Sequence, residues 1–278
     1  MLENEKVNSN KVYSAFVNIF GRGEKALICY IVGGYPDIET SKEIIKTIIS
    51  SGADIIEIGI PFSDPMAEGP IIQEASSKAL SRGITPHTCF DIVKDLKKDY
   101  RDTPFLFMTY SNIVFSNNLN NFLSTAKRNG IDGFIIPDLN IEEAVEYSSL
   151  AKKLNLATVF LSAPNTSNKR IHEIAVASTG FVYMVSVFGT TGSRTKFERY
   201  TFDAVVKTKE ITSKCKVPVA VGFGISNTKD GKNMLKSGAD GIIIGSSIMK
   251  LIMDNEKNKE KMMLDLSNYI RELKSICR

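Results

Sequence analysis

The sequence predicts an α/β fold: a single (β/α)8 barrel, or TIM barrel, over residues 1–278, with an extra helix before its first strand. Short β-branched apolar runs alternate with longer amphipathic patterns, as expected of parallel strands covered by helices. A length of 278 residues suits one such barrel. The eight predicted strands are Ala26–Val32, Asp54–Ile58, Phe105–Thr109, Gly133–Pro137, Ala157–Ser162, Phe181–Ser186, Val217–Gly222 and Gly241–Gly245.

Polar residues that suit N-caps mark where the predicted helices begin. The extra helix is expected over Lys11–Gly21, whose apolar positions lie on one face, and we expect it to cap the bottom of the barrel. A second helix is expected over Lys42–Ser51. The predicted starts of three helices are Thr40-Ser41, Asn140 before an acidic first turn, and Ser226-Asn227.

One short phrase recurs where predicted helices give way to strands. A glycine ends the helix, a small or apolar residue follows, and an aspartate precedes the strand. We interpret this weak repeat as belonging to the stable end of the barrel, opposite the reactive end. The three copies are Ser51-Gly52-Ala53-Asp54, Asn129-Gly130-Ile131-Asp132 and Ser237-Gly238-Ala239-Asp240.

Composition argues against several classes of protein. Lys and Arg exceed Asp and Glu by only 35 to 31, so no nucleic-acid partner is indicated. The four cysteines form no CxxC pair, which disfavours a zinc site and a disulfide framework. The N-terminus lacks the apolar core of a signal peptide, and no run approaches the roughly 18 apolar residues of a membrane span. We therefore expect a cytoplasmic protein without a membrane partner.

Glu57 is the strongest candidate for chemistry, because it interrupts a run of isoleucines. Ile56 and Ile58 fall on one face of the predicted strand, whereas Glu57 falls on the other. If helices cover the isoleucine face, Glu57 points into the centre of the barrel. Burying a carboxylate is costly unless it is protonated or paired, which favours a functional role. The alternative is a strand end at which Glu57 simply reaches water.

Three further carboxylates follow strands: Asp64 and Glu68 on one loop, and Asp138 after the fourth strand. Carboxylates that face a ligand from two sides can act as separate acid and base. Neither histidine falls at a strand end, and no lysine lies inside a predicted strand, so a histidine-rich metal site and Schiff-base chemistry are disfavoured. The pattern favours proton transfer between carboxylates and a substrate.

Two glycine-rich turns accompany the last two strands, Val221–Ser226 after the seventh and Gly241–Ser247 after the eighth. Glycines let backbone N–H groups approach an anion, and late loops of this kind commonly bind phosphate in barrels. The alternative is a pair of tight turns without a ligand. The loop Phe188–Lys196 is expected to fold over a substrate from the reactive end, although a plain surface loop has the same composition.

The stretch from Glu57 to Gln73, EIGIPFSDPMAEGPIIQ, resembles the signature of the tryptophan synthase α subunit family. GTTGSR at 189–194 and GFGIS at 222–226 extend the resemblance over essentially the whole chain. It implies retro-aldol cleavage of indole-3-glycerol phosphate to indole and glyceraldehyde 3-phosphate without metal or organic cofactor. It also implies a β subunit that carries pyridoxal phosphate, receives the indole and completes an αββα heterotetramer.

The resemblance also assigns roles to residues. Glu57 matches the catalytic glutamate, which handles protons at indole C3 and the glycerol hydroxyl. Glu68 matches a second carboxylate that acts on the ring nitrogen, where the family usually has aspartate. The remaining matches are Tyr183 and Thr191 for support of the catalytic loop, Gly192, Gly224, Gly245 and Ser246 for phosphate, Phe223 for the indole pocket, and Asp64, Pro65, Tyr110, Asn112 and Asp138 for loops that face the partner.

Two other interpretations remain open from the sequence. In the first, the chain is a free-standing indole-glycerol-phosphate lyase that works without a β subunit. In the second, it is a regulatory subunit that binds the ligand and cleaves it slowly because of Glu68. Indole release with and without a partner, and the effect of Glu68→Asp, distinguish them.

Overall fold

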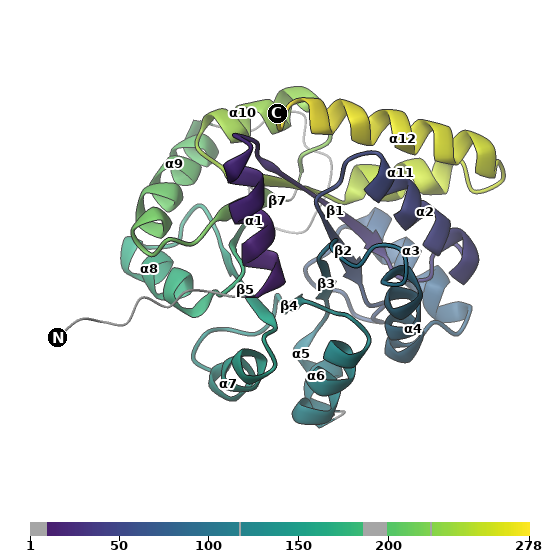
Figure 1. Ribbon diagram of the computed structural model, residues 1–278, viewed down its shortest axis with the longest axis horizontal. Coiled ribbons are helices and arrows are strands. Elements are labelled where there is room, and N and C mark those ends of the chain that lie inside the picture. The colour runs from purple at the N-terminus through teal and green to yellow at the C-terminus, as the bar shows by residue number, and fades with distance from the viewer. Residues whose placement is uncertain (1–9, 117, 186–198, 223) are drawn as a thin grey trace.

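The computed structural model is a closed barrel of parallel strands in the order β1 to β8, surrounded by helices (Figure 1). It describes residues 10–116, 118–185, 199–222 and 224–278. The predicted (β/α)8 architecture is therefore confirmed. The strands are β1 Ala26–Val32, β2 Ile55–Gly59, β3 Phe105–Met108, β4 Gly133–Ile135, β5 Ala157–Ser162, β6 Val182–Val185, β7 Val219–Gly222 and β8 Gly241–Ile244.

All eight strands lie where the sequence places them, but several ends differ. The strand β7 begins at Val219 rather than Val217, since Pro218 has no N–H group for the ladder. The strand β4 ends at Ile135, two residues before Pro137, for which the same restriction holds. The strand β2 begins after Asp54, whose side chain accepts a hydrogen bond from the Leu27 N–H of β1.

The helices that cover the barrel mostly follow the predicted caps. Within the described ranges, every helix is too short or too polar to cross a membrane. The helices are α1 Lys11–Gly21, α2 Ile38–Ser50, α3 Pro70–Ser81, α4 Pro86–Leu96, α5 Ser111–Ser116, α6 Leu119–Arg128, α7 Val145–Lys153, α8 Asn168–Ala177, α9 Arg199–Lys214, α10 Thr228–Lys236, α11 Ser246–Asp254 and α12 Lys259–Ser275.

One predicted helix start is wrong and one is displaced. Asp37 caps α2 by accepting a hydrogen bond from the Thr40 N–H at 2.9 Å, so the helix begins four residues before Lys42. Asn140 accepts from the Glu143 N–H at 2.9 Å, but that turn precedes the regular helix. Asn227 caps α10 as expected.

Helix α1 closes the amino-terminal end of the barrel, as predicted, and crosses in front of the strands in Figure 1. Val12, Phe16 and Ile19 are buried on its inner face. The Phe16 ring lies 5.5 Å from that of Phe181, beside the start of β6. The Asn10 amide donates to the Thr179 carbonyl at 2.8 Å, which fixes the start of the helix.

The repeated glycine–aspartate phrase ties neighbouring strands together at this same end. Asp240 accepts a hydrogen bond from the Val219 N–H of β7 at 2.9 Å and pairs with Lys209 of α9 at 2.6 Å. Asp54 likewise accepts a hydrogen bond from the Leu27 N–H and pairs with Lys274. Asp132 accepts from the Phe105 N–H and pairs with Lys97.

The glycine of each phrase has a positive φ, and at Gly52 and Gly130 the missing side chain also leaves room for the lysine stem. At Gly130, a Cβ atom would lie 2.6 Å from Cγ of Lys97. The phrase is therefore a structural device at the stable end, in agreement with its predicted location.

Replacing Asp240 by alanine tests this device. The side chain is 4% exposed, and its loss leaves the Lys209 ammonium and the Val219 N–H without their acceptor. We expect the free energy of unfolding in urea to fall by about 3 kcal/mol. Asp265→Ala, which removes an exposed ion pair with Lys261 on α12, should cost less than about 1 kcal/mol. Equal losses would contradict the assigned role.

Candidate active site

Glu57 lies in the middle of β2, between Tyr30 of β1 and Leu106 of β3 in the sheet register. Its side chain is fully buried, and neither carboxylate oxygen has a hydrogen-bond partner among the described residues. The predicted inward orientation is confirmed. Burial, together with the negative charge of Glu68, raises the pKa of Glu57 from 4.5 to about 8. The barrel therefore holds a neutral carboxylic acid at its centre near pH 7.

Glu68 reaches the same pocket from the loop between β2 and α3. Its side chain is 5% exposed, and it accepts a hydrogen bond from the hydroxyl of Tyr110. That hydroxyl in turn accepts from the Ala67 N–H at 2.9 Å, and the Tyr110 ring stacks on Phe62 at 4.9 Å. Burial raises the pKa of Glu68, and the hydrogen bond from Tyr110 opposes the rise. The second carboxylate is thus held in place by its own loop and by β3.

Two tyrosines flank the carboxylates, and each leans across a glycine of the next strand. A Cβ atom at Gly59 would lie 2.1 Å from the Tyr30 hydroxyl, and one at Gly222 would lie 2.4 Å from that of Tyr183. Burial, reinforced by Glu57 and Glu68, raises the pKa of both phenols, so they remain protonated donors. These glycines therefore leave room for the two phenol groups that line the pocket.

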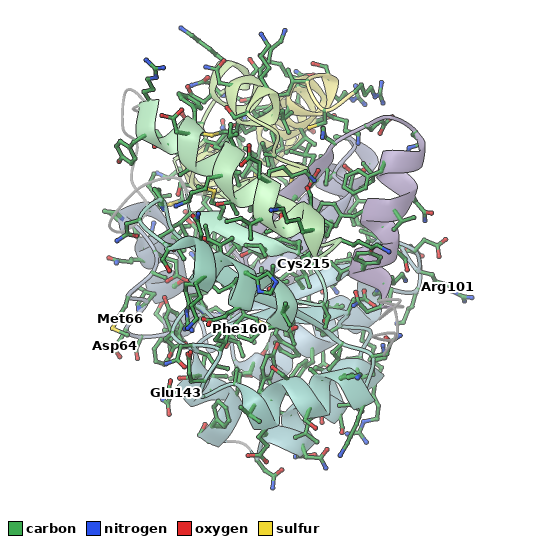
Figure 2. All side chains as sticks on the ribbon, turned by 90° about the vertical axis from the view of Figure 1, so that its left-hand side faces the viewer. Asp64, Met66, Arg101, Glu143, Phe160 and Cys215 are labelled. Carbon is green, nitrogen blue, oxygen red and sulfur yellow. The ribbon has the colours of Figure 1, made fainter. Side chains whose placement is uncertain are left out.

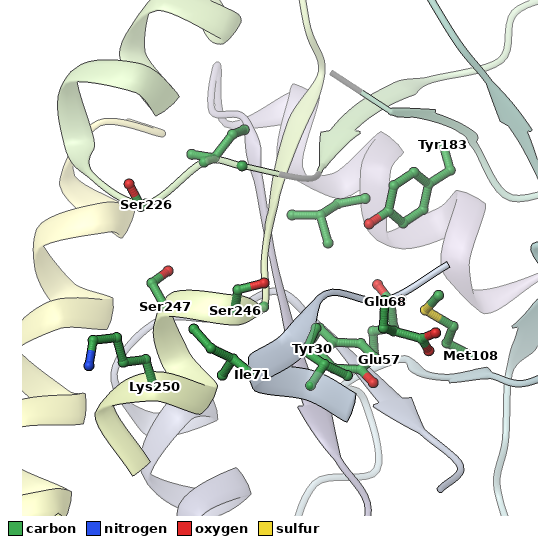
Figure 3. Close-up of a pocket in the computed structure, with 15 residues that line it drawn as sticks. Tyr30, Glu57, Glu68, Ile71, Met108, Tyr183, Ser226, Ser246, Ser247 and Lys250 are labelled. Atoms are coloured by element: carbon green, nitrogen blue, oxygen red, sulfur yellow. The ribbon is translucent and has the colours of Figure 1, made fainter. Parts of the chain in front are cut away.

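The other end of the pocket is formed by the turns after β7 and β8. Helix α11 begins there, and its N-cap Gly245 makes no side-chain capping bond. The first N–H groups of the helix and the serine hydroxyls provide donors for an anion. Figure 3 shows this end, with Ser226, Ser246 and Ser247, apart from the end that holds Glu57, Glu68 and Tyr183.

Most of the predicted ligand-contacting residues come together around this one pocket. Thr191, Gly192 and Phe223 lie outside the described residues. The pocket is lined by six of the predicted residues, namely Glu57, Glu68, Tyr183, Gly224, Gly245 and Ser246.

Sequence reasoning missed several residues that also line this pocket. Tyr30 is one of them. The one feature of the sequence that could have indicated it is that an aromatic residue with a polar hydroxyl stands inside a buried strand. Met108 and Lys250 were missed as well, whereas Ser226 and Ser247, which also line the pocket, belong to the two glycine-rich turns predicted to bind phosphate.

The residues predicted to face a partner fall into two groups. Asp64, Asn112 and Asp138 are exposed and Pro65 is half-buried, and Asp138 accepts a hydrogen bond from the Ser111 hydroxyl at 2.7 Å. Tyr110 differs from the expectation: it is 2% exposed, because its ring stacks on Phe62 and its hydroxyl serves Glu68. Figure 2 shows Asp64 and Met66 at the opposite end of the molecule from Arg101.

Comparisons with known proteins agree on one family. The family model described as tryptophan synthase alpha chain matches residues 16–278. A tryptophan synthase alpha chain of Francisella tularensis is 37% identical over 96% of this chain and 98% of its own length. The alpha chain of Aquifex aeolicus is 42% identical over 95% of this chain and 97% of its own.

Solved structures agree with these sequence matches. A structure from Aquifex aeolicus superposes with a TM-score of 0.86 at 39% identity, covering 97% of this chain and 99% of that one. A tryptophan synthase alpha subunit of Pyrococcus furiosus gives a TM-score of 0.81 at 37% identity, covering 90% and 98%. A chain of Mycobacterium tuberculosis tryptophan synthase gives 0.83 at 27% identity, covering 97% and 100%.

The raised pKa of Glu57 predicts how stability depends on pH. Between pH 4.5 and about 8 the folded protein keeps a proton on Glu57 that the unfolded chain releases, so rising pH destabilises the fold through this residue. The stability of Glu57→Gln relative to wild type should therefore rise by roughly 1 kcal/mol per pH unit across this window. Urea unfolding of both proteins at several pH values measures the difference, and a constant difference would contradict the burial argument.

Proposed function

The chain belongs to the tryptophan synthase alpha chain family, and from this premise we propose that it cleaves indole-3-glycerol phosphate into indole and glyceraldehyde 3-phosphate. The indole is then passed to a β subunit for tryptophan biosynthesis. The observation that carries the proposal is Glu57, a buried carboxyl group without a partner, in a pocket whose far end suits a phosphate. An acid and an anion site in one pocket fit a substrate with an aromatic ring at one end and a phosphate at the other.

Glu57 supplies the proton chemistry in this proposal. With a pKa of about 8 it is protonated near neutrality and can give its proton to C3 of the indole. The carboxylate that results can then accept the proton of the glycerol hydroxyl next to the scissile carbon. The bond from C3 to that carbon breaks, its electron pair restores the indole ring, and the carbon becomes the aldehyde of glyceraldehyde 3-phosphate. One residue thus acts first as acid and then as base.

Glu68 acts at the ring nitrogen. Protonation at C3 places positive charge on the ring, and a carboxylate near the nitrogen stabilises it. Burial raises the pKa of Glu68 as well, but the hydrogen bond from Tyr110 opposes that rise, whereas Glu57 has no hydrogen-bond partner among the described residues. The two carboxylates are thereby suited to different roles, as in other enzymes with paired acids.

The partner in this proposal is a tryptophan synthase β subunit in an αββα heterotetramer. Asp64, Asn112 and Asp138 are exposed beyond the carboxyl ends of the strands, Asn112 on the short helix α5 and the other two on loops, where such a subunit is expected to dock. We propose that cleavage itself needs no metal or organic cofactor, and that pyridoxal phosphate resides only in the β subunit.

An indole-release assay tests the proposed reaction. Purified protein with indole-3-glycerol phosphate should release indole, and added β subunit should raise the rate. Glu57→Gln should lower kcat by at least about 100-fold, because the amide cannot carry the proton. The variant should still bind glycerol 3-phosphate like the wild type, which is the control for folding. No indole release by the wild type would contradict the proposal, and a rate that the β subunit does not raise would favour a free-standing lyase.

Glu68→Asp tests whether the pocket is adapted to the longer side chain. Shortening the chain by one methylene withdraws the carboxylate from the hydroxyl of Tyr110 or from the substrate. We expect kcat to fall by about 10- to 100-fold, since a displacement near 1 Å carries a penalty of that size. Increased activity in the steady-state indole assay would instead support the regulatory-subunit interpretation.

A further inference from the structure

The phosphate end of the pocket contains a cationic side chain that sequence reasoning did not single out. Lys250 lies on α11 and lines the pocket together with Ser226, Ser246 and Ser247 (Figure 3). Among the described lining residues it is the only cation, whereas Glu57 and Glu68 are both acidic. A phosphate monoester carries close to two negative charges at neutral pH, and the neutral donors of the turns do not offset them.

Lys250 is placed to reach an anion at the start of α11. It follows Ser246 by four residues, so the two side chains lie on one face of the helix. In the absence of a ligand its ammonium pairs with Asp254, at 2.8 and 3.1 Å from the two carboxylate oxygens. The side chains of this pair are 61% and 57% exposed, and exposed pairs at this spacing are weak.

An independent observation marks this helix start as part of a ligand pocket. Glu57 is fully buried and its oxygens have no partner among the described residues, yet it lines the same pocket as Gly245 and Ser246. A pocket that takes no ligand does not account for an unpaired carboxyl group at its other end.

We propose that Lys250 exchanges Asp254 for the substrate phosphate and so determines the preference for phosphorylated substrates. The inference rests on the proposed function and adds a charged contact to the backbone and serine donors. Asp254 is then a competitor that holds the ammonium outside the pocket until the phosphate enters. Because the contact is made at the far end of the substrate, it contributes to binding and hardly to the bond-breaking step.

Lys250→Gln tests the proposal through a split between KM and kcat. We expect KM for indole-3-glycerol phosphate to rise by about 10-fold while kcat stays within about two-fold, as for the loss of a charge-assisted contact that is made equally before and during reaction. Asp254→Asn should lower KM by about two-fold, because it frees the ammonium. Calorimetry with glycerol 3-phosphate should show the same order of affinities without any cleavage.

Lys261→Gln is the matched control. Lys261 forms a similar exposed pair, with Asp265 at 2.9 Å, but lies on α12 and is not among the residues that line the pocket. It should leave KM and the affinity for glycerol 3-phosphate unchanged. If Lys250→Gln behaves like this control, or lowers kcat at constant KM, the inference is overturned. A wild type that binds glycerol 3-phosphate but releases no indole overturns the proposed reaction instead, so the two failures are distinguishable.

Discussion

The burial of the Glu57 carboxyl group without a partner is the constraint on which the rest of the site depends. The side chain is fully buried inside the barrel, so the charged form is destabilised and the pKa rises to about 8. The negative charge of Glu68 reinforces the effect; burial raises the pKa of Glu68 too, and the hydrogen bond from Tyr110 opposes that rise. In the proposed reaction, two carboxyl groups in one pocket thereby take different roles: Glu57 donates a proton and Glu68 stabilises a charge. Under the proposed function, this cost is retained because the position serves the reaction.

The two ends of the barrel divide stability and chemistry between them. At the amino-terminal end, buried aspartates join neighbouring strands and bind lysines of the surrounding helices, as Asp240 does with Val219 and Lys209. At the carboxyl-terminal end the same strands end in glycines and short loops that leave donors and carboxylates facing the pocket. Polar groups are thus satisfied at the end that holds the fold together and left unsatisfied where a ligand is expected.

The sequence predicts the fold well because its signals are local and periodic. Alternation in β2 placed Glu57 inside, and the glycine–aspartate phrases located the turns before three strands. The start of α2 was wrong because Asp37, Thr40 and Ser41 all suit a cap, and only the folded chain shows that Asp37 is used. Tyr110 was assigned to a partner-facing loop by the resemblance, and the sequence does not show that its ring stacks on Phe62 and its hydroxyl donates to Glu68. Tyr30 and Lys250 were missed for a related reason: strand register and helix phase, which bring them to the pocket, are tertiary properties.

The central claim is that Glu57 is a neutral acid at the pH at which the protein works, and its titration is the most direct test. Carboxyl groups labelled with carbon-13 in glutamate can be followed by NMR across pH, with Glu57→Gln used to assign the resonance. Our account predicts a midpoint near 8, which falls when Glu68 is replaced by glutamine because a neighbouring negative charge is removed. A midpoint near the ordinary value of 4.5 would show that water or another group stabilises the carboxylate, and would contradict the account.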